Sequence, residues 1–232
     1  MSARRVIVTG AEGGLGRAIV AALTEAGHTV AGCDIGDFDV RDRKAVDGGV
    51  ARLVGELGGC DAIVANAGVV DTIHRAERFS QEEWAKDLET NLTGPFNVIR
   101  AAFESLAESG DGRVVVISSA SAETGLPGQV AYTAAKAGLV GMARTLAAEW
   151  GPHGIRCNVV MPGVIATPKV KALPDAVREG IAATLPLRRI GEPAEIAGTV
   201  EFLLSRAAAY ITGTVIRVDG GYGLNTLSLA GG

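Results

Sequence analysis

The sequence predicts an α/β fold in which helices cover both faces of a doubly wound, mostly parallel sheet. First, short runs rich in Val and Ile alternate with longer stretches of helical periodicity. Second, these runs are almost continuously apolar, as is typical of parallel strands buried on both faces. Third, no linker or low-complexity tract divides the 232 residues, so residues 1–232 are expected to form one domain.

The expected strands and helices alternate along the chain. The strands are Arg5–Thr9, Thr29–Asp34, Ala62–Asn66, Val114–Ser118, Arg156–Val160 and Val215–Val218. The helices are Leu15–Ala26, Arg43–Leu57, Gln81–Ser109, Val130–Trp150 and Ala194–Leu204, with a possible short helix around Asp175–Ala183. Such alternation predicts right-handed crossovers between parallel strands.

The second crossover is expected to be shortened near residues 35–40. Only Ile35–Phe38 separate Asp34 from the next extended pair, Asp39-Val40. A parallel crossover needs about 10–12 residues or more, so a helix has no room here. We therefore predict that this helix is deleted and that the adjoining edge strand is vestigial.

Composition argues against several classes of protein. The formal net charge of −4 disfavours nucleic acid as the main partner. The three cysteines, Cys33, Cys60 and Cys157, are widely spaced and match no metal motif, so we expect buried thiols in a reducing compartment and no metal. No signal peptide or apolar run of membrane-spanning length is evident, which favours a cytoplasmic protein without a membrane partner.

A glycine-rich turn follows the first expected strand. Gly10, Gly14 and Gly16 lie in Thr9–Gly16, where the next helix opens. Backbone N–H groups at such a turn can approach a pyrophosphate closely, although the spacing is not the strict G-x-G-x-x-G. A plain tight turn is the alternative interpretation.

Asp34 stands at the end of the second expected strand, 18 residues after Gly16. A carboxylate there can accept hydrogen bonds from an adenosine ribose and would repel a 2′-phosphate, which favours NAD over NADP. Arg17 and Arg41 are the residues that could still favour NADP. A solvated loop aspartate is the alternative.

Tyr132 and Lys136 share one face of an expected helix, because residues i and i+4 are neighbours. An ammonium favours phenolate, so the lysine should lower the pKa of the tyrosine and fit it for acid–base chemistry. Ser118 and Ser119 end a buried strand, at the edge of the sheet where ligands of open α/β sheets bind. Either motif alone is more often structural: a solvated helix face, or a turn.

Together these motifs make the chain similar to the short-chain dehydrogenase/reductase family over nearly its whole length. The matching segments are Thr9–Gly16, Asp61 with Ala65-Asn66-Ala67-Gly68, Asn91 in Thr90–Gly94, Ser119 placed 13 residues before Tyr132, Lys136, Pro162-Gly163 with Thr167, and Val218-Asp219-Gly220-Gly221. The resemblance implies a Rossmann fold. The family more often has Asn where Ala65 stands.

The resemblance also implies roles for the matching residues. Tyr132 would be the acid–base, Ser119 would bind the substrate oxygen, Lys136 would hold the nicotinamide ribose, and Asn91 would position a water that relays protons to Lys136. The implied dinucleotide-binding set is Gly10, Gly14, Leu15, Gly16, Asp34, Ile35, Asp39, Val40, Asn66, Ala67, Gly68, Tyr132, Lys136, Pro162, Gly163, Ile165 and Thr167. The shortened connection leaves open whether Asp39-Val40 still reaches adenine.

The resulting hypothesis is an NAD-dependent oxidoreductase that interconverts a secondary alcohol and a ketone. A cofactor-free lyase of the same fold would be expected to carry Arg in place of Lys136, and a non-catalytic dinucleotide-binding or scaffolding protein would be expected to lack part of the catalytic group. We expect residues 164–189 to cover the substrate and a homo-oligomer, tetramer or dimer. Residues 222–232 form a tail that is either disordered or a subunit contact, and the substrate itself is not revealed.

Overall fold

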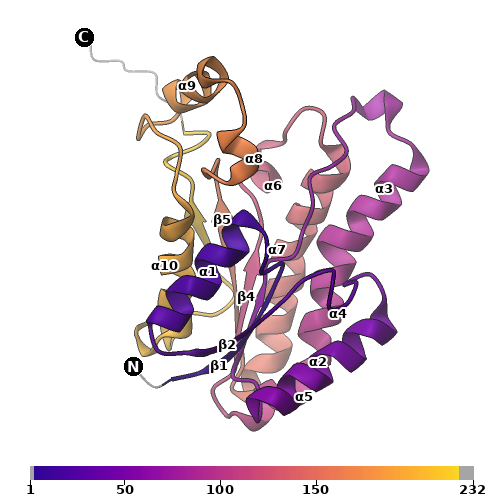
Figure 1. The fold of residues 1–232 in the computed structure, drawn as a ribbon, viewed down its shortest axis with the longest axis vertical. Helices are drawn as coiled ribbons and strands as arrows, with labels where there is room; N and C mark the ends of the chain where they lie inside the picture. The colour runs from indigo at the N-terminus through magenta and orange to yellow at the C-terminus, as the bar shows by residue number, and fades with distance from the viewer. Residues whose placement is uncertain (1–2, 225–232) are drawn as a thin grey trace.

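The structure, a computed structural model, describes residues 3–224 and contains one parallel sheet (Figure 1). Its strands run in the spatial order β2-β1-β3-β4-β5-β6. They are β1 (Arg5–Thr9), β2 (Thr29–Cys33), β3 (Ala62–Ala65), β4 (Arg113–Ile117), β5 (Arg156–Pro162) and β6 (Val215–Val218). Every neighbouring pair is parallel, which confirms the predicted doubly wound class.

Two layers of helices cover the faces of the sheet. Helices α1 (Gly14–Glu25) and α10 (Pro193–Leu204) pack on one face, and α2 (Arg43–Leu57), α4 (Gly94–Ala101) and α7 (Val130–Trp150) pack on the other. Successive strand side chains point to opposite faces. Accordingly, Ile7 of β1 is buried with the α2 layer, whereas its neighbours Val6 and Val8 are buried with the α1 layer.

The predicted shortening of the second crossover is confirmed. After β2 the chain forms turns through residues 34–42, no strand forms at Asp39-Val40, and α2 then leads back to β3. The sheet therefore ends at β2 within the described residues. Phe38 is buried beneath α2, and a Cβ added at Gly49 would come within 2.2 Å of its ring. The missing strand and helix are thus replaced by one aromatic side chain packed against a glycine.

The predicted single helix over residues 81–109 is wrong, because the structure breaks it into four parts. Helix α3 (Gln81–Leu88) runs into a π-helical turn (Glu89–Thr93), which is followed by α4 and then α5 (Phe103–Glu108). Pro95 lacks the N–H that a continuous α-helix needs, and π-turns often occur at functional sites. The break lies beside the candidate site described below.

Three short helices lie near the carboxyl ends of the strands. Helix α9 (Asp175–Thr184) agrees with the expected short helix, whereas α6 (Ser121–Thr124) and α8 (Pro168–Lys171) were not predicted. Short 3₁₀ turns complete the described elements, at Ala76–Arg78, Gly151–His153 and Arg206–Ala208. Most of the predicted tail, residues 225–232, lies outside the described residues.

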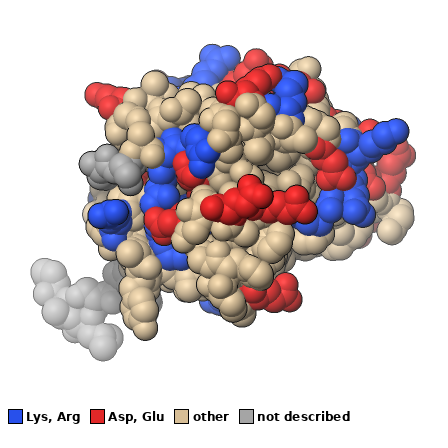
Figure 2. Space-filling model, turned by 90° about the horizontal axis from the view of Figure 1, so that it is seen from below, with Lys and Arg blue, Asp and Glu red and all other residues tan. Residues whose placement is uncertain are grey.

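Within residues 3–224 the three cysteines are free thiols, and the side chains form no metal site. Each cysteine is buried, and burial raises the pKa of each thiol to about 12, which keeps the thiols protonated and inert. Residues 3–224 contain no cluster of three His, Cys, Asp or Glu side chains that could hold a metal ion. None of the described helices is long and apolar enough to cross a membrane. Figure 2 shows acidic and basic side chains interspersed over one face.

Candidate active site

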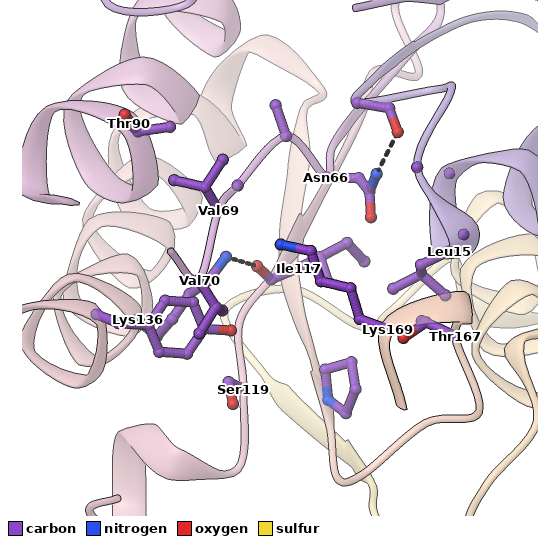
Figure 3. A pocket seen from close by; sticks show the side chains of 18 of the residues that line it. Leu15, Asn66, Val69, Val70, Thr90, Ile117, Ser119, Lys136, Thr167 and Lys169 are labelled. Atoms are coloured by element: carbon purple, nitrogen blue, oxygen red, sulfur yellow. Dashed lines mark hydrogen bonds between the residues drawn. The ribbon is translucent and has the colours of Figure 1, made fainter. Parts of the chain in front are cut away.

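A cavity of ≈ 930 Å³ opens above the carboxyl ends of the strands (Figure 3). Its walls come from the turn after β1, the loops after β2, β3 and β4, the start of α7, and the segment after β5. Ligands of open α/β sheets bind in such a crevice. Every predicted site residue except Asn91 lines this cavity, so residues far apart in sequence meet in one place.

The predicted catalytic group is assembled on β4 and α7. Ser119 follows β4, and Tyr132 and Lys136 lie on one face of α7, with Lys136 Nζ 5.6 Å from the centroid of the Tyr132 ring. Lys136 Nζ donates a hydrogen bond to the Ile117 carbonyl at 2.9 Å (Figure 3). Ser118 Oγ donates to the Lys136 carbonyl at 2.8 Å, so both hydroxyl and ammonium fasten α7 to the end of β4.

Burial dominates the electrostatics of this pair. Burial lowers the pKa of Lys136 from 10.5 to about 8. Burial also raises the pKa of Tyr132, while a hydrogen bond with Ser119 acts in the opposite direction. The expectation that Lys136 acidifies the phenol is therefore not met here, because the ammonium is bonded to the Ile117 carbonyl and desolvation favours the neutral phenol.

Asn91 lies behind the cavity wall, in the π-helical turn. Its Oδ1 accepts from Val69 N at 3.0 Å, and its Nδ2 donates to the carbonyls of Val69 and Asp87 at 3.1 and 3.0 Å. A Cβ at Gly68 would come within 2.8 Å of Asn91 Oδ1 and 3.2 Å of Lys136 Nζ. The side chain of Asn91 thus fixes the loop after β3 close to Lys136.

The glycine turn has the close backbone packing that its sequence predicts. Gly10 has φ +66°, and a Cβ there would lie 2.8 Å from Ala67 Cα; a Cβ at Gly16 would lie 2.0 Å from the Gly10 carbonyl oxygen. Asn66 Nδ2 donates to the carbonyls of Thr9 and Gly10 at 3.0 and 3.1 Å. The loop after β3 therefore holds the turn after β1 in place.

Helix α1 presents its N-terminus to the cavity. The helix begins at Gly14, Gly13 supplies no side-chain cap, and no acidic residue lies in the first turn. Helix N-termini bind anions through free N–H groups and the helix dipole. The residues present therefore fit the pyrophosphate of a dinucleotide.

The far end of the cavity is acidic. The Asp34 carboxylate accepts from Glu12 N at 2.9 Å and from Ile35 N at 2.8 Å, which fixes it at the edge of the cavity, while the Ile35 side chain is 68% exposed. Arg41 is held by the Asp39 carboxylate, with Nη2 2.6 Å from Oδ2. The hydrogen bond lowers the pKa of Asp39, so this ion pair is maintained.

Asp39 and Val40 reach the cavity despite the shortened connection. Asn97 Nδ2 of α4 donates to the Val40 carbonyl at 3.0 Å, and a Cβ at Gly94 would come within 2.6 Å of Val40 Cγ2. Gly94, at the start of α4, thus lets the loop that contains Val40 pack closely against this helix. Asp39 and Val40 thus line the cavity, and their contact with adenine stays a prediction.

The segment after β5 forms the opposite wall. Pro162, Gly163, Ile165 and Thr167 line the cavity as predicted. Thr167 and Pro168 also lie over the glycine turn, because a Cβ at Gly14 would come within 2.4 Å of Pro168 Cδ. The large apolar residues in the later part of this segment do not line the cavity: Leu173, Val177, Ile181 and Leu185.

Several residues that line the cavity were missed by sequence reasoning, among them Ser121, Lys169 and Tyr222. Ser121 is buried beside Ser119, Lys169 reaches over the cavity from α8, and Tyr222 lines it from near the C-terminus. Only Ser121 carried a usable signal, its position two residues after the candidate Ser119. The other two depend on how distant segments pack.

A parallel α/β sheet, a glycine turn at a helix N-terminus and a Ser-Tyr-Lys group built around a buried lysine define an oxidoreductase of the dinucleotide-binding class. A family model described as enoyl-(acyl carrier protein) reductase matches residues 32–223. The chain is 39% identical to the 3-oxoacyl-[acyl-carrier-protein] reductase MabA of Mycobacterium tuberculosis, over 95% of this chain and 93% of the relative. It is 38% identical to the acetoacetyl-CoA reductase of Rhizobium meliloti, over 94% and 98%.

A solved structure agrees with these relatives. Ligand-free aldohexose dehydrogenase of Thermoplasma acidophilum superposes with a TM-score of 0.91 at 30% identity, over 99% of this chain and 98% of that one. The chain belongs to the short-chain dehydrogenase/reductase family, whose members are oxidoreductases that use a nicotinamide dinucleotide.

Proposed function

We propose that this protein interconverts a secondary alcohol and a ketone, with NAD as its dinucleotide. The observation that carries the proposal is the meeting of Ser119, Tyr132 and Lys136 at one end of a cavity whose other end is the glycine turn. A nicotinamide dinucleotide supplies the hydride acceptor or donor when bound. The residues of the chain then have to bind, orient and exchange a proton.

Each catalytic side chain has a separate task in this proposal. The phenol oxygen of Tyr132 takes the proton of the alcohol, or returns it to the ketone oxygen, because it is the acid–base group nearest Ser119. Ser119 hydrogen-bonds the same substrate oxygen. Lys136 binds a ribose hydroxyl, and Asn91 holds the loop beside it for a water-mediated proton relay.

The remaining predicted residues would hold the dinucleotide. The N-terminus of α1 and the turn that contains Gly10, Gly14, Leu15 and Gly16 would bind its pyrophosphate. The loop after β3 would hold the adenosine ribose, and Asp39 and Val40 would contact adenine. Pro162, Gly163, Ile165 and Thr167 would hold the nicotinamide.

The proposed preference for NAD rests on Asp34. Its carboxylate is fixed at the cavity edge, where it can accept hydrogen bonds from a ribose diol but repels a 2′-phosphate. Arg41, the cation that could offset this repulsion, is already paired with Asp39. Arg17 does not line the cavity.

We expect Asp34→Asn to reduce the preference for NAD over NADP, measured as the ratio of the two kcat/KM values, by about tenfold or more. The variant keeps the shape but removes the charge, and like charges in close contact cost several kcal/mol, where each 1.4 kcal/mol is about tenfold. Asp37→Asn is the matched control, since Asp37 carries the same charge in the same turn but does not line the cavity. A wild-type protein that prefers NADP would refute the assignment.

We propose an acyl thioester bearing a 3-oxo group as the ketone. Two relatives near 39% identity are named for such substrates, 3-oxoacyl-[acyl-carrier-protein] and acetoacetyl-CoA. The wall on the substrate side includes Val69, Val70 and Leu126, which suits an acyl chain better than a sugar. The test measures absorbance at the NADH band with 3-oxoacyl thioesters, aldohexoses and simple secondary alcohols; tight NAD binding without turnover of any of them would favour a non-catalytic binding protein.

We also propose that residues 164–189 cover the substrate and that further copies of the chain assemble with it. Lys169 of α8 extends across the cavity (Figure 3) and pairs with Asp71, which follows β3, at 3.2 Å. This ion pair connects the covering segment to the opposite wall. The side chains are 77% and 52% exposed, so the pair is weak and can open for ligand exchange.

We expect Lys169→Met and Asp71→Asn each to raise the KM of the ketone by about two- to fivefold at low ionic strength, in line with 0.2–1 kcal/mol for an exposed pair. High salt should remove the difference from wild type, because it screens the pair. The exchanged double variant, Lys169→Asp with Asp71→Lys, should recover most of the loss. Increases in KM that persist unchanged at high salt would show that the ion pair does not hold residues 164–189 over the substrate.

A further inference from the structure

The Ser119 hydroxyl is held by Ser121, which follows it by two residues. Ser119 Oγ accepts a hydrogen bond from Ser121 Oγ at 3.0 Å and a second, longer one from Ser121 N at 3.3 Å. A hydroxyl has one hydrogen to donate and two acceptor positions. Both acceptor positions of Ser119 are therefore occupied by one residue, and its hydrogen remains to be donated elsewhere.

Ser121 is itself firmly placed. It is 5% exposed and begins helix α6, where its carbonyl accepts from Gly125 N at 2.8 Å. The preceding residue, Ala120, donates its N–H to the Pro162 carbonyl at the end of β5, also at 2.8 Å. The turn after β4 is thus fastened to the next strand, and the Ser121 side chain has little freedom to turn away from Ser119.

We propose that Ser121 is a positioning residue, whose hydroxyl occupies the acceptor side of Ser119 and so directs the Ser119 hydrogen towards the phenol oxygen of Tyr132 and the substrate oxygen beside it. This inference rests on the proposed alcohol–ketone activity. It adds a fifth side chain, one that acts through Ser119, to the apparatus formed by Asn91, Ser119, Tyr132 and Lys136.

The direction of the hydrogen bond has a consequence for the phenol. With both acceptor positions filled, Ser119 can interact with Tyr132 only as a donor. Donation to the phenol oxygen stabilises phenolate and lowers the pKa of Tyr132, which is the direction in which Ser119 acts against burial. Removing the Ser121 hydroxyl lets Ser119 rotate, and this stabilisation is then partly lost.

The experiment compares Ser121→Ala, Ser121→Cys and Ser121→Thr with wild type. Ala removes the donor, Cys keeps the size with a weaker donor, and Thr restores a hydroxyl. We expect kcat to fall about five- to tenfold in Ser121→Ala, where tenfold is about 1.4 kcal/mol. The values for Cys should be intermediate and those for Thr near wild type. The dissociation constant of NADH should change less than about twofold, because Ser121 donates to Ser119 rather than to the dinucleotide.

A second measurement does not depend on turnover. The chain has only three tyrosines, so the ultraviolet titration of tyrosinate, read as a difference from Tyr132→Phe, isolates the phenol of Tyr132. We expect Ser121→Ala to raise that pKa by about 0.5–1 unit, and the acidic limb of the pH–kcat profile of alcohol oxidation to move with it. If no alcohol is oxidised by wild type, the proposed function fails, while this titration still tests the role of Ser121.

Thr124→Val is the matched control. Thr124 lies in the same short helix, and its hydroxyl bonds to the Ala120 carbonyl at 3.1 Å without touching Ser119. It should alter neither the tyrosinate titration nor the pH profile. Unchanged kcat and unchanged titration in Ser121→Ala would overturn the proposal, as would equal effects of Ser121→Ala and Thr124→Val. If Ser121→Ala does not fold, Ser121→Cys and Ser121→Thr are compared instead. Equal kcat values and equal tyrosinate titrations in these two variants would then overturn the proposal.

Discussion

Tyr132→Phe is expected to lower kcat for alcohol oxidation by about 10²–10⁴-fold, the range that one positioned acid–base group contributes. The phenol oxygen is the only heavy atom removed, and the ring keeps its place beside Lys136. The dissociation constant of NADH, followed by its fluorescence, should change less than about threefold. The effect therefore belongs to proton transfer rather than to binding or folding.

Tyr210→Phe serves as the control, because Tyr210 is fully exposed and does not line the cavity. It should match wild type in kcat, KM and thermal stability. A Tyr132→Phe protein that keeps more than about a tenth of wild-type kcat would fall outside the expected range and show that another group exchanges the proton. The proposed mechanism would then be wrong even if the protein oxidises alcohols.

Lys136→Met is expected to lower kcat by about 10²-fold or more, because in the proposed mechanism the ammonium holds the nicotinamide ribose beside Tyr132. The substitution should also change how stability depends on pH. The pKa of Lys136 falls from 10.5 in the unfolded chain to about 8 in the folded protein. Below pH 8 the lysine is therefore protonated in both the folded and the unfolded state, and burying its charge destabilises the folded state.

Between about pH 8 and 10.5 the unfolded chain binds more protons than the folded one, so wild type gains stability as pH rises. The gain relative to Lys136→Met should approach about 3 kcal/mol over this window, at 1.36 kcal/mol per pKa unit. Urea unfolding of both proteins at several pH values measures it. Lys171→Met, at an exposed lysine outside the cavity, should show no such difference, and a flat difference for Lys136→Met would contradict the buried charge.

Local pattern was enough to predict most of the fold. Helix α7 has the predicted bounds, Val130–Trp150, and so does β6, because continuous apolar periodicity determined both. The short connection at residues 35–40 was also predictable, since chain length alone excludes a crossover helix there. The stretch 81–109 was not, because the break depends on Pro95 and on bonds between Asn91 and the distant Val69.

In the candidate site, too, some features follow from local sequence and others depend on contacts between distant segments. Spacing along one helix or one turn was enough to predict which side chains would carry the proposed chemistry, because it brings Tyr132 to Lys136 and the glycines to a helix N-terminus. Only the tertiary structure decided that Asp39 and Val40 still reach the cavity, that Ser121 holds Ser119, and that burial governs the pKa values of Tyr132 and Lys136. Those properties arise from contacts and desolvation between segments far apart in the chain, which periodicity does not record.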